Sequence, residues 1–467
     1  MFRRNLKYIF LICLCGLYFQ QAHSQQKVLS LKEAEQTALA NYETIKSKTN
    51  QLNATKANLS ESRTEYLPDV NISAQQAYGT VNGQYGPALG LNGSISSSGP
   101  VLNHQNWNAG FGSLYLSNIS WNFFAFGRAI EKVKVQKTSV SRDESDLAQE
   151  QFQHQIRVAA TYLNLLASQQ LSKAAQDNLS RTIDIQTVVG ARVKSGLNPG
   201  VDSSQANAEV AAARIALTNA RETEQEQSNQ LAQYLAIVPP QGFLLDSLFV
   251  TKAPVNTDPQ SNTNLENHPL LRFYQNRVAV SDEQAKYLST FSYPSFTLFG
   301  AYQGRGSGFS STYGTNQNDY NSGYGSGADP TRFNYLFGAG VTWNITNPFR
   351  VHYLVRSQKF TSAQYQNDYN LVSQQLSAEQ VLAETKISNS LKNFHDAPAE
   401  IKAARDAYVQ KSALYKNGLA NIVDLTQALY VLNRAEVDNY IASNNVWQAL
   451  LYKAAATGDL GIFMNNF

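Results

Sequence analysis

The sequence predicts a mixed membrane protein in which part of a β-barrel is joined to a long α-helical barrel. Three observations predict this fold class. The chain contains two structural repeats, each repeat has a run of 68 residues typical of one very long helix, and each has two strands with an uncharged aromatic face. Each repeat is therefore predicted to run helix, strand, strand, helix, which gives four strands per chain.

The repeat is clearest in two short segments, residues 194–206 and residues 416–428. Both contain Gly-Leu followed by Val-Asp and by Gln-Ala. Glycine permits the left-handed exit from one helix, and Asp-x-x-Gln is typical of the capping pair that starts the next. Each segment therefore predicts a sharp turn between two long helices. The matching positions share one offset of 222 residues: Gly196 with Gly418, Asp202 with Asp424, and Gln205 with Gln427.

The composition favours a protein with polar but mostly uncharged surfaces. Charged residues make up 16% of the 467 residues, which is below the roughly 25% of an average soluble protein. The net charge is +3, and three of the basic residues lie in a segment that we expect to be removed. A nearly neutral mature chain has no electrostatic footprint for nucleic acid.

Residues 1–24 have the layout of a secretory signal peptide. Basic residues are followed by the short apolar segment Tyr8–Phe19, and Ala22-His-Ser24 supplies small residues for cleavage. We therefore expect the mature chain to begin at Gln25. The alternative is a membrane anchor, which needs roughly 20 apolar residues and is longer than this segment.

Both cysteines of the chain, Cys13 and Cys15, lie in this segment. Lipid attachment at Cys15 stays an alternative, although Leu14 is bulkier than the residue expected before a lipidated cysteine. The mature chain is then expected to contain no disulfide and no cysteine metal site.

The first repeat, residues 25–237, begins with a predicted helix over Val28–Thr64. From Asp69 the apolar period changes to two, which predicts a strand. A second strand follows the glycine- and serine-rich loop 79–106. One face of that strand is apolar (Trp107, Ala109, Phe111, Tyr115, Ile119, Trp121) and the other polar (Asn108, Gly110, Gly112, Asn118, Ser120, Asn122).

The segment from Arg128 to Ser195 is a run of 68 residues without proline. As a single helix it would be about 100 Å long. Val201–Ile237 is predicted to run back beside it. Residues 238–264 contain four prolines and are predicted to be a connector outside the repeat.

The second repeat, residues 265–457, has the same order, and a C-terminal tail (458–467) follows it. Its second strand again alternates aromatic residues with asparagine, glycine and threonine. The predicted elements are a helix over Leu265–Phe291, a strand over Ser295–Tyr302, a glycine-rich loop over 303–330, a strand over Phe333–Trp343, a helix over Arg350–Asn417 and a return helix over Leu419–Thr457.

An uncharged aromatic face opposite a polar, glycine-rich face is typical of strands in a membrane β-barrel. Four strands cannot close a barrel, and open sheet edges are not stable in lipid. The chain must therefore associate, with two copies supplying 8 strands and three copies supplying 12. Only the larger barrel leaves an obvious lumen, because a barrel of about eight strands is filled by side chains.

On these features the chain resembles the TolC-like outer membrane factor family over nearly all of its mature length. The resemblance rests on the paired repeats, the two Gly-x5-Asp-x2-Gln-Ala turns, Leu67-Pro68 and Tyr293-Pro294 before the strands, and Trp121-Asn-Phe-Phe-Ala-Phe-Gly-Arg128. It implies a homotrimer with a 12-stranded barrel in the outer membrane and a 12-helix tunnel in the periplasm. The connector 238–264 and the tail would form an equatorial belt.

This family forms the passive exit duct of tripartite drug efflux pumps and type I secretion systems. The resemblance implies outer-membrane lipid, a periplasmic adaptor (membrane fusion) protein and an inner-membrane transporter of the resistance-nodulation-division or ABC type as partners. It implies no cofactor and no catalytic activity. The alternative is a periplasmic helical scaffold or adaptor without a barrel, which leaves the aromatic alternation in both repeats unexplained.

In this family the two turns lie at the periplasmic tip, where the tunnel is closed at rest. By resemblance, Asp424 matches an acid of the constriction ring, and Asp202 and Tyr415 match a pair that links neighbouring helices in the closed state. Gln427 stands where better-known members have a second ring acid, and Ala420 where they have a gate arginine. These departures imply weaker cation selectivity and a looser gate. Independently, both aspartates can serve as helix N-caps.

Five aromatic residues are candidates for a girdle at the membrane interface, and the alternative is the core of a soluble β-sandwich. The loops 79–106 and 303–330 are predicted to be extracellular. Catalysis is not predicted, because the five histidines of the mature chain lack metal-ligand spacing and no phosphate-binding loop or nucleophile elbow is present. The girdle candidates are Trp107, Tyr115, Trp121, Tyr335 and Trp343.

Overall fold

The computed structural model describes residues 28–83, 99–238, 242–246, 253–254 and 265–466, so the predicted signal peptide lies outside it. The described residues belong to two compact units. The first unit takes its residues from Met1–Leu52, Asp143–Gln275 and Asn367–Phe467, and the second from Asn53–Arg142 and Asn276–Gln366. Several helices contribute residues to both units.

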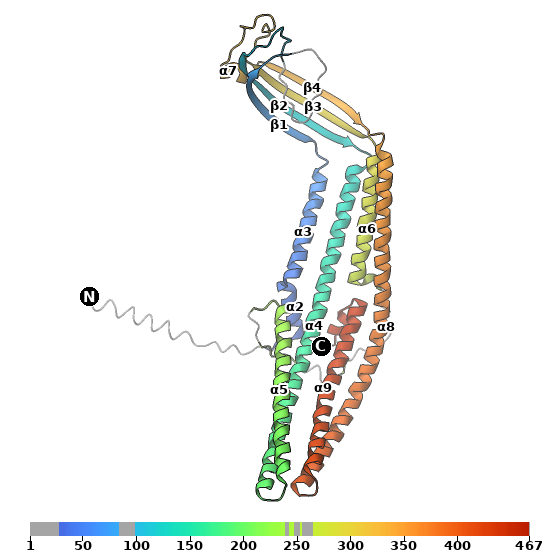
Figure 1. Cartoon of the computed structure of the whole chain (residues 1–467). Coiled ribbons are helices and arrows are strands. Elements are labelled where there is room, and N and C mark those ends of the chain that lie inside the picture. The colour runs from blue at the N-terminus through green and yellow to red at the C-terminus, as the bar shows by residue number, and fades with distance from the viewer. Residues whose placement is uncertain (1–27, 84–98, 239–241, 247–252, 255–264, 467) are drawn as a thin grey trace, which may run out of the picture. The chain divides into compact units, whose positions relative to one another are not determined.

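The helices lie close to their predicted positions (Figure 1). Helix α4 (Arg128–Lys194) has 67 residues and α8 (Asn347–Lys416) has 70, which confirms the two very long helices. No helix in the described ranges is both long enough and apolar enough to cross a membrane. The other helices are α2 (Leu31–Asn41), α3 (Glu43–Thr64), α5 (Gly200–Tyr234), η1 (Leu265–Asn267), α6 (Pro269–Ser289), η2 (Thr290–Ser292), α9 (Ile422–Thr457) and α10 (Gly461–Met464).

The prediction of one uninterrupted helix over Val28–Thr64 is wrong at Tyr42. This residue is extended (ψ 122°), so α2 ends before it and α3 begins after it. Its amide donates to the Ala38 carbonyl (3.0 Å), and its ring stacks on the His154 imidazole with centroids 3.8 Å apart. The contact with α4 holds the interrupted helix in place.

The core of the first unit is built from α2, α4, α5, α8 and α9 together with Leu245 and Phe463. Tyr162 of α4 is fully buried in it. The Tyr162 hydroxyl donates to the Leu29 carbonyl (2.8 Å) and accepts from the Asp246 amide (3.0 Å). This tyrosine therefore attaches both the start of the described chain and residues 242–246 to the helices.

The end of α9 is held against the start of α6 by His268. Its Nε2 lies 3.0 Å from the Ala455 carbonyl oxygen, and burial lowers the pKa of the imidazole. Gly458 ends α9 with φ 76°, where a side chain would meet His268 at 2.7 Å. The predicted helix over Leu265–Phe291 is interrupted here, because Pro269 has no amide hydrogen to continue it from η1.

The second unit contains one antiparallel sheet in the order β1-β2-β3-β4 (Figure 1). Strands β1 and β4 each pair with one neighbour among the described residues, so both outer edges of the sheet are open. Neighbouring strands in the sheet follow one another in sequence order, so no strand order crossover is needed. The strands are β1 (Asp69–Thr80), β2 (Ala109–Phe124), β3 (Ser295–Ser307) and β4 (Arg332–Thr342).

The register of the sheet confirms the two predicted faces. Cross-strand partners lie on the same face, and Val70 pairs with Ile119 while Tyr302 pairs with Tyr335. On the opposite face Asn71 pairs with Asn118. One face is therefore aromatic and aliphatic, and most of its large side chains are exposed in the single chain.

Strand β3 is longer than predicted, because it continues from Tyr302 to Ser307 through glycine-rich residues expected to form a loop. The short helix α7 (Tyr324–Ala328), which was not predicted, folds onto β2 and β3 from the same loop. A Cβ atom on Gly306 would lie 2.5 Å from the carbonyl oxygen of Asp329. Glycine is required in this strand because the loop packs directly on its backbone.

Candidate functional site

The two turns between the long helices have the same backbone. Gly196 (φ 72°) and Gly418 (φ 77°) are both left-handed. In the first turn the Leu197 amide donates to the Arg192 carbonyl (2.9 Å), and the equivalent bond from Leu419 has the same length. This is a Schellman motif, which favours glycine at the left-handed position. Each turn closes a hairpin of two helices, α4–α5 and α8–α9 (Figure 1).

The helices after the turns are not capped by the aspartates. Helix α5 follows the N-cap Pro199, and α9 follows Asn421, whose side chain accepts the Asp424 amide (2.8 Å). The N-cap interpretation of Asp202 and Asp424 is therefore wrong, because each lies within the first turn of its helix. A carboxylate at that position is still stabilised by the partial positive charge of the helix start.

Tyr415 joins the two hairpins through Asn198. The tyrosine is buried (2% exposed) in an apolar cluster that contains residues of α4, α5 and α9. The Asn198 amide donates to the Tyr415 hydroxyl (3.3 Å) and to the Asp202 carboxylate (2.7 Å). Asp202 and Tyr415, the pair implied by the resemblance, are thus brought together, with Asn198 between them.

The environment of Tyr415 keeps its hydroxyl protonated. Burial raises the pKa of Tyr415, and the nearby Asp202 carboxylate raises it further, while Arg192 and the Asn198 hydrogen bond act in the opposite direction. A protonated hydroxyl can accept from Asn198 and retain a hydrogen to donate.

Arg192, close to the end of α4, adds further contacts between the hairpins. Its Nε donates to Asn198 Oδ1 (2.8 Å) and its Nη1 donates to the Lys416 carbonyl (3.1 Å). The guanidinium carbon also lies 5.5 Å from the centroid of the Tyr415 ring, within the range of a cation–π interaction. Arg192 therefore holds the end of α8 against the first turn.

Asp424 and Gln427 lie on the first two turns of α9. The Asp424 carboxylate is 44% exposed and lies 3.4 Å from Lys411 Nζ of α8. An exposed pair of this kind contributes about 0–1 kcal/mol. Gln427 is exposed as well. Both side chains are open to solvent in the single chain, whereas Tyr415 is not.

Arg192, Asn198 and Lys411 were not predicted from the sequence. Asn198 could have been found from the repeat, because it occupies the position of Ala420 in the second turn. Arg192 and Lys411 lie on long helices, where charged residues are usually solvated. The sequence pattern therefore carried no signal for Arg192 or Lys411.

Glu436 of α9 forms a second link between the hairpins. Its carboxylate accepts two hydrogen bonds from Arg181 of α4 (3.0 and 2.6 Å), and Arg405 of α8 lies 3.7 Å away. The Glu436 side chain is 11% exposed. A largely buried carboxylate needs its partner, because breaking such a pair leaves an uncompensated charge.

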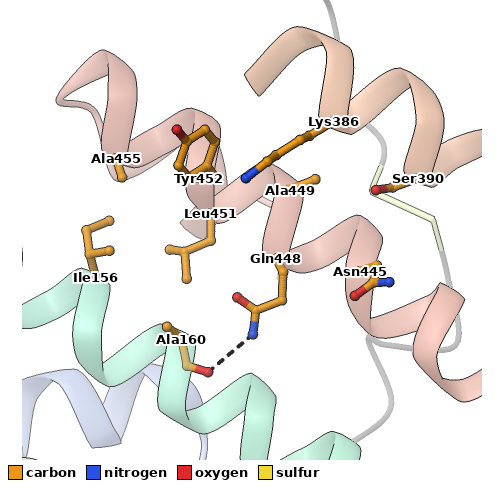
Figure 2. Close-up of a pocket in the computed structure, with 10 residues that line it drawn as sticks. All are labelled: Ile156, Ala160, Lys386, Ser390, Asn445, Gln448, Ala449, Leu451, Tyr452 and Ala455. Carbon is orange, nitrogen blue, oxygen red and sulfur yellow. Dashed lines mark hydrogen bonds between the residues drawn. The ribbon is translucent and has the colours of Figure 1, made fainter. Parts of the chain in front are cut away.

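A groove of about 390 Å³ lies between α4, α8 and α9 (Figure 2). The Gln448 amide reaches across to α4, where it donates to the Ala160 carbonyl (3.3 Å) and to Asn164 Oδ1 (2.9 Å). Lys386 Nζ lies 4.0 Å from the centroid of the Tyr452 ring. Apart from Lys386, the described residues that line the groove include no carboxylate, imidazole or second basic side chain, so the groove lacks an acid–base pair.

Two of the predicted girdle residues are anchored at equivalent places in the two repeats. Trp121 Nε1 donates to the Tyr66 carbonyl (2.8 Å), and Trp343 Nε1 donates to the Ser292 carbonyl (3.1 Å). Each indole is therefore fixed to the segment that precedes the first strand of its own repeat.

The other predicted girdle residues have different surroundings. Trp107 precedes β2 and is 80% exposed, and Tyr335 on β4 is 76% exposed. The Tyr115 hydroxyl donates to the Ala328 carbonyl (3.2 Å) and is covered by α7. Tyr115 is therefore closer to a loop than to a free outer surface.

The described part of the chain contains no group of three or more histidine, cysteine, aspartate or glutamate side chains that could hold a metal ion. The sites above offer hydrogen bonds, buried charge and apolar surface. Such groups can hold helices together or line a passage.

The model of a family described as outer membrane efflux protein matches residues 34–236 and 261–458, one segment in each repeat. No curated protein sequence matches the chain.

Several solved structures share the fold. The outer membrane protein VceC from Vibrio cholerae has a TM-score of 0.71 and 16% identity, with 92% of this chain and 96% of that chain covered. The CmeC outer membrane channel of Campylobacter jejuni has a TM-score of 0.73 and 14% identity, covering 92% and 85%. The Neisseria gonorrhoeae MtrE outer membrane channel, in its open state, has a TM-score of 0.71 and 15% identity, covering 92% and 89%.

Proposed function

Because the chain belongs to the outer membrane efflux protein family, we propose that it is the passive exit duct of a tripartite efflux pump or a type I secretion system. Three copies assemble into one channel-tunnel, with the sheets in the outer membrane and the helices in the periplasm. Solutes cross through the lumen, and other proteins supply the energy. Selectivity then depends on pore width and lining charge.

The observation that carries this proposal is the sheet of the second unit. It has two open edges and one face of exposed aromatic and aliphatic side chains, including Ile72, Phe337 and Trp343. An open edge in lipid leaves backbone groups without hydrogen bonds. Pairing of β4 of one copy with β1 of the next satisfies both edges, and three copies give a 12-stranded barrel with a lumen.

The tunnel is proposed to close at the two turns. Asn198 and Arg192 hold the second hairpin against the first through Tyr415 and Lys416. Separation of the hairpins breaks these contacts and widens the passage. Asp424, with Gln427 one turn away, supplies the negative lining charge. The open state named for the gonococcal channel supports a gate that moves in this fold.

The partners of such a duct are two further copies of the chain, outer-membrane lipid, a periplasmic adaptor protein and an inner-membrane transporter of the resistance-nodulation-division or ABC type. The adaptor bridges the gap between the two membranes. No cofactor is needed, because the duct carries out no reaction.

Membrane fractionation of cells that express the full chain tests the location. We expect the protein in the outer-membrane fraction, with faster migration after heating, because heat dissociates the detergent-resistant trimer into single chains. A soluble periplasmic product would instead indicate the helical scaffold without a barrel.

Planar-bilayer recording tests the gate. Tyr415→Phe and Arg192→Ala should raise single-channel conductance, because each removes contacts between the hairpins. Asp424→Ala should lower the preference for cations, because it removes a lining carboxylate. Tyr430→Phe is the matched control, since Tyr430 lies on α9 and is exposed. If Tyr415→Phe and Asp424→Ala leave conductance and ion preference unchanged, the gate is elsewhere.

A further inference from the structure

The ion pair between Arg181 and Glu436 joins the two hairpins well away from the turns. Arg181 of α4 lies roughly 22 Å from Gly196 along the helix, at about 1.5 Å per residue. Its guanidinium donates two hydrogen bonds to the Glu436 carboxylate of α9 (3.0 and 2.6 Å). The hairpins are therefore linked at two separate levels, by this pair and by the contacts at the turns.

Two apolar clusters beside the ion pair each belong to a single hairpin. One cluster, which includes Leu179 and Val210, packs α4 on α5. The other, which includes Ala404 and Ala435, packs α8 on α9. Each hairpin thus has a core of its own at this level, and the ion pair connects one hairpin to the other.

The ion pair is largely withdrawn from water. The side chain of Glu436 is 11% exposed and that of Arg181 is 23% exposed, and Arg405 of α8 lies 3.7 Å from the same carboxylate. Arg181 Nε is buried and has no hydrogen-bond partner among the described residues. Separation of the pair would leave two poorly solvated charges apart, which is strongly unfavourable.

The contacts at the turns are easier to break. The Asn198–Tyr415 hydrogen bond joins two neutral groups at 3.3 Å, and the bond from Arg192 to the Lys416 carbonyl is exposed to water. Water replaces an exposed bond at little cost, and a bond between neutral groups is weaker than one between charged groups. A force that separates the hairpins therefore breaks the turn contacts before the ion pair.

We propose that the Arg181–Glu436 pair is the pivot of the opening movement, because it stays intact while the hairpins separate between it and the turns. The inference rests on the proposed duct and its gate. Separation is then confined to roughly the last 22 Å of the hairpins. The turn contacts determine how often the passage opens, and the ion pair determines how wide it becomes.

Planar-bilayer recording of E436Q in two backgrounds tests the pivot. In the otherwise wild-type chain, E436Q should leave the conductance unchanged, because the turn contacts still hold the hairpins together. Added to Y415F, it should raise the conductance by a further factor of about two, since the separation then extends along a longer stretch of helix and the two effects are not additive. Larger polyethylene glycols should also enter Y415F/E436Q than enter Y415F.

R434Q is the matched control for the loss of a charge on α9. Arg434 is 69% exposed and pairs with Asp438 of the same helix, so R434Q should have no effect in either background. If E436Q alone raises the conductance as much as Y415F does, the pair is a second latch and the pivot is wrong. Unchanged conductance and polymer entry on adding E436Q to Y415F also overturns the pivot.

Two further comparisons separate the pivot from the proposals on which it rests. Trimer migration on gels establishes that each variant assembles, and if E436Q does not, R181Q/E436Q, which removes both charges, is tested in the same way. Failure of the wild type to form channels would overturn the proposed duct. Channels that Y415F leaves unchanged would overturn the gate at the turns, and the pivot with it.

Discussion

Glu35 is a carboxyl group inside the helical core of the first unit. The residue is 6% exposed, and its Oε1 has no hydrogen-bond partner among the described residues. Burial raises the pKa of Glu35 to about 7. The fold therefore favours the protonated carboxyl, and ionisation of this one group opposes folding.

The sign of the pH dependence follows from that raised pKa. The stabilising effect of protonated Glu35 is complete below about pH 4.5 and is lost as the pH rises through about 7. Glu35→Gln should therefore stabilise the protein by about 1–3 kcal/mol at pH 8 and have little effect at pH 4.5. Thermal unfolding of the detergent-solubilised protein at the two pH values measures the difference.

Glu43→Gln is the matched control for this prediction. Glu43 begins α3 and its side chain is 82% exposed beside Lys46. Its replacement should change the melting temperature little at either pH. An equal effect of the two substitutions would contradict the burial and the raised pKa of Glu35.

The two turns show how glycine fixes a helical hairpin. Gly196→Ala and Gly418→Ala should each destabilise the protein by about 1–2 kcal/mol, because alanine is strained at φ 72° and 77°. The Gly418 substitution also brings a methyl group to within 3.3 Å of Arg192 Nη2. Chemical denaturation measures both changes.

Gly190→Ala separates the turn effect from a general effect of glycine. Gly190 lies inside α4, and a side chain there meets nothing within 4 Å. Alanine is favoured over glycine in a helix by about 1 kcal/mol, so this variant should be more stable than the wild type. If Gly190→Ala also lowered the stability, the left-handed backbone of the turns would not explain the effect of Gly196→Ala and Gly418→Ala.

Periodicity predicted the elements whose environment is uniform along their length. The helical run from Arg128 and the strand alternation at Phe333 continue without a breaker, and both elements are present. The break at Tyr42 could not be predicted, because it depends on the ring of His154, which lies on a helix far away in the sequence. The extension of β3 to Ser307 was not predicted, because glycines normally indicate a loop. Here they lie within the strand and leave space for the β3–β4 loop to pack on it.

The candidate site was predictable only where the repeat or the resemblance reached it. Tyr415 and Asp202 lie near each other as the resemblance implies, yet Asn198 stands between them. Arg192 is separated from Lys416 by more than two hundred residues, and no local pattern relates them. Contacts of this kind come from the packing of one hairpin on the other.

Cysteine cross-linking tests the proposed assembly of the whole molecule. With Ser73→Cys on β1, a second cysteine is placed in turn at Asn334, Leu336, Gly338 and Gly340 of β4. One or two of these pairs should give linked dimers and trimers under oxidation, because the edges of neighbouring copies meet. Nothing larger than a trimer should form, which denaturing gels without reductant can show.

A cysteine pair within one sheet is the control. Ser73 and Leu116 are cross-strand partners, so Ser73→Cys with Leu116→Cys should give a linked single chain. Cys13 and Cys15 lie in the predicted signal peptide, so no native thiol is expected to interfere. Linked products that stop at the dimer would contradict three-fold closure.

The shared backbone of the two turns has a consequence for symmetry. The glycines and their hydrogen bonds are the same in both turns, but Asn198 stands where the second has Ala420. In a trimer the backbone of the six turns then approaches six-fold symmetry, while the side-chain chemistry repeats only three-fold. A partner protein that docks in three copies can distinguish the turn with Asn198 from the turn with Ala420. A partner protein that docks in six copies must bind the backbone conformation that all six turns share.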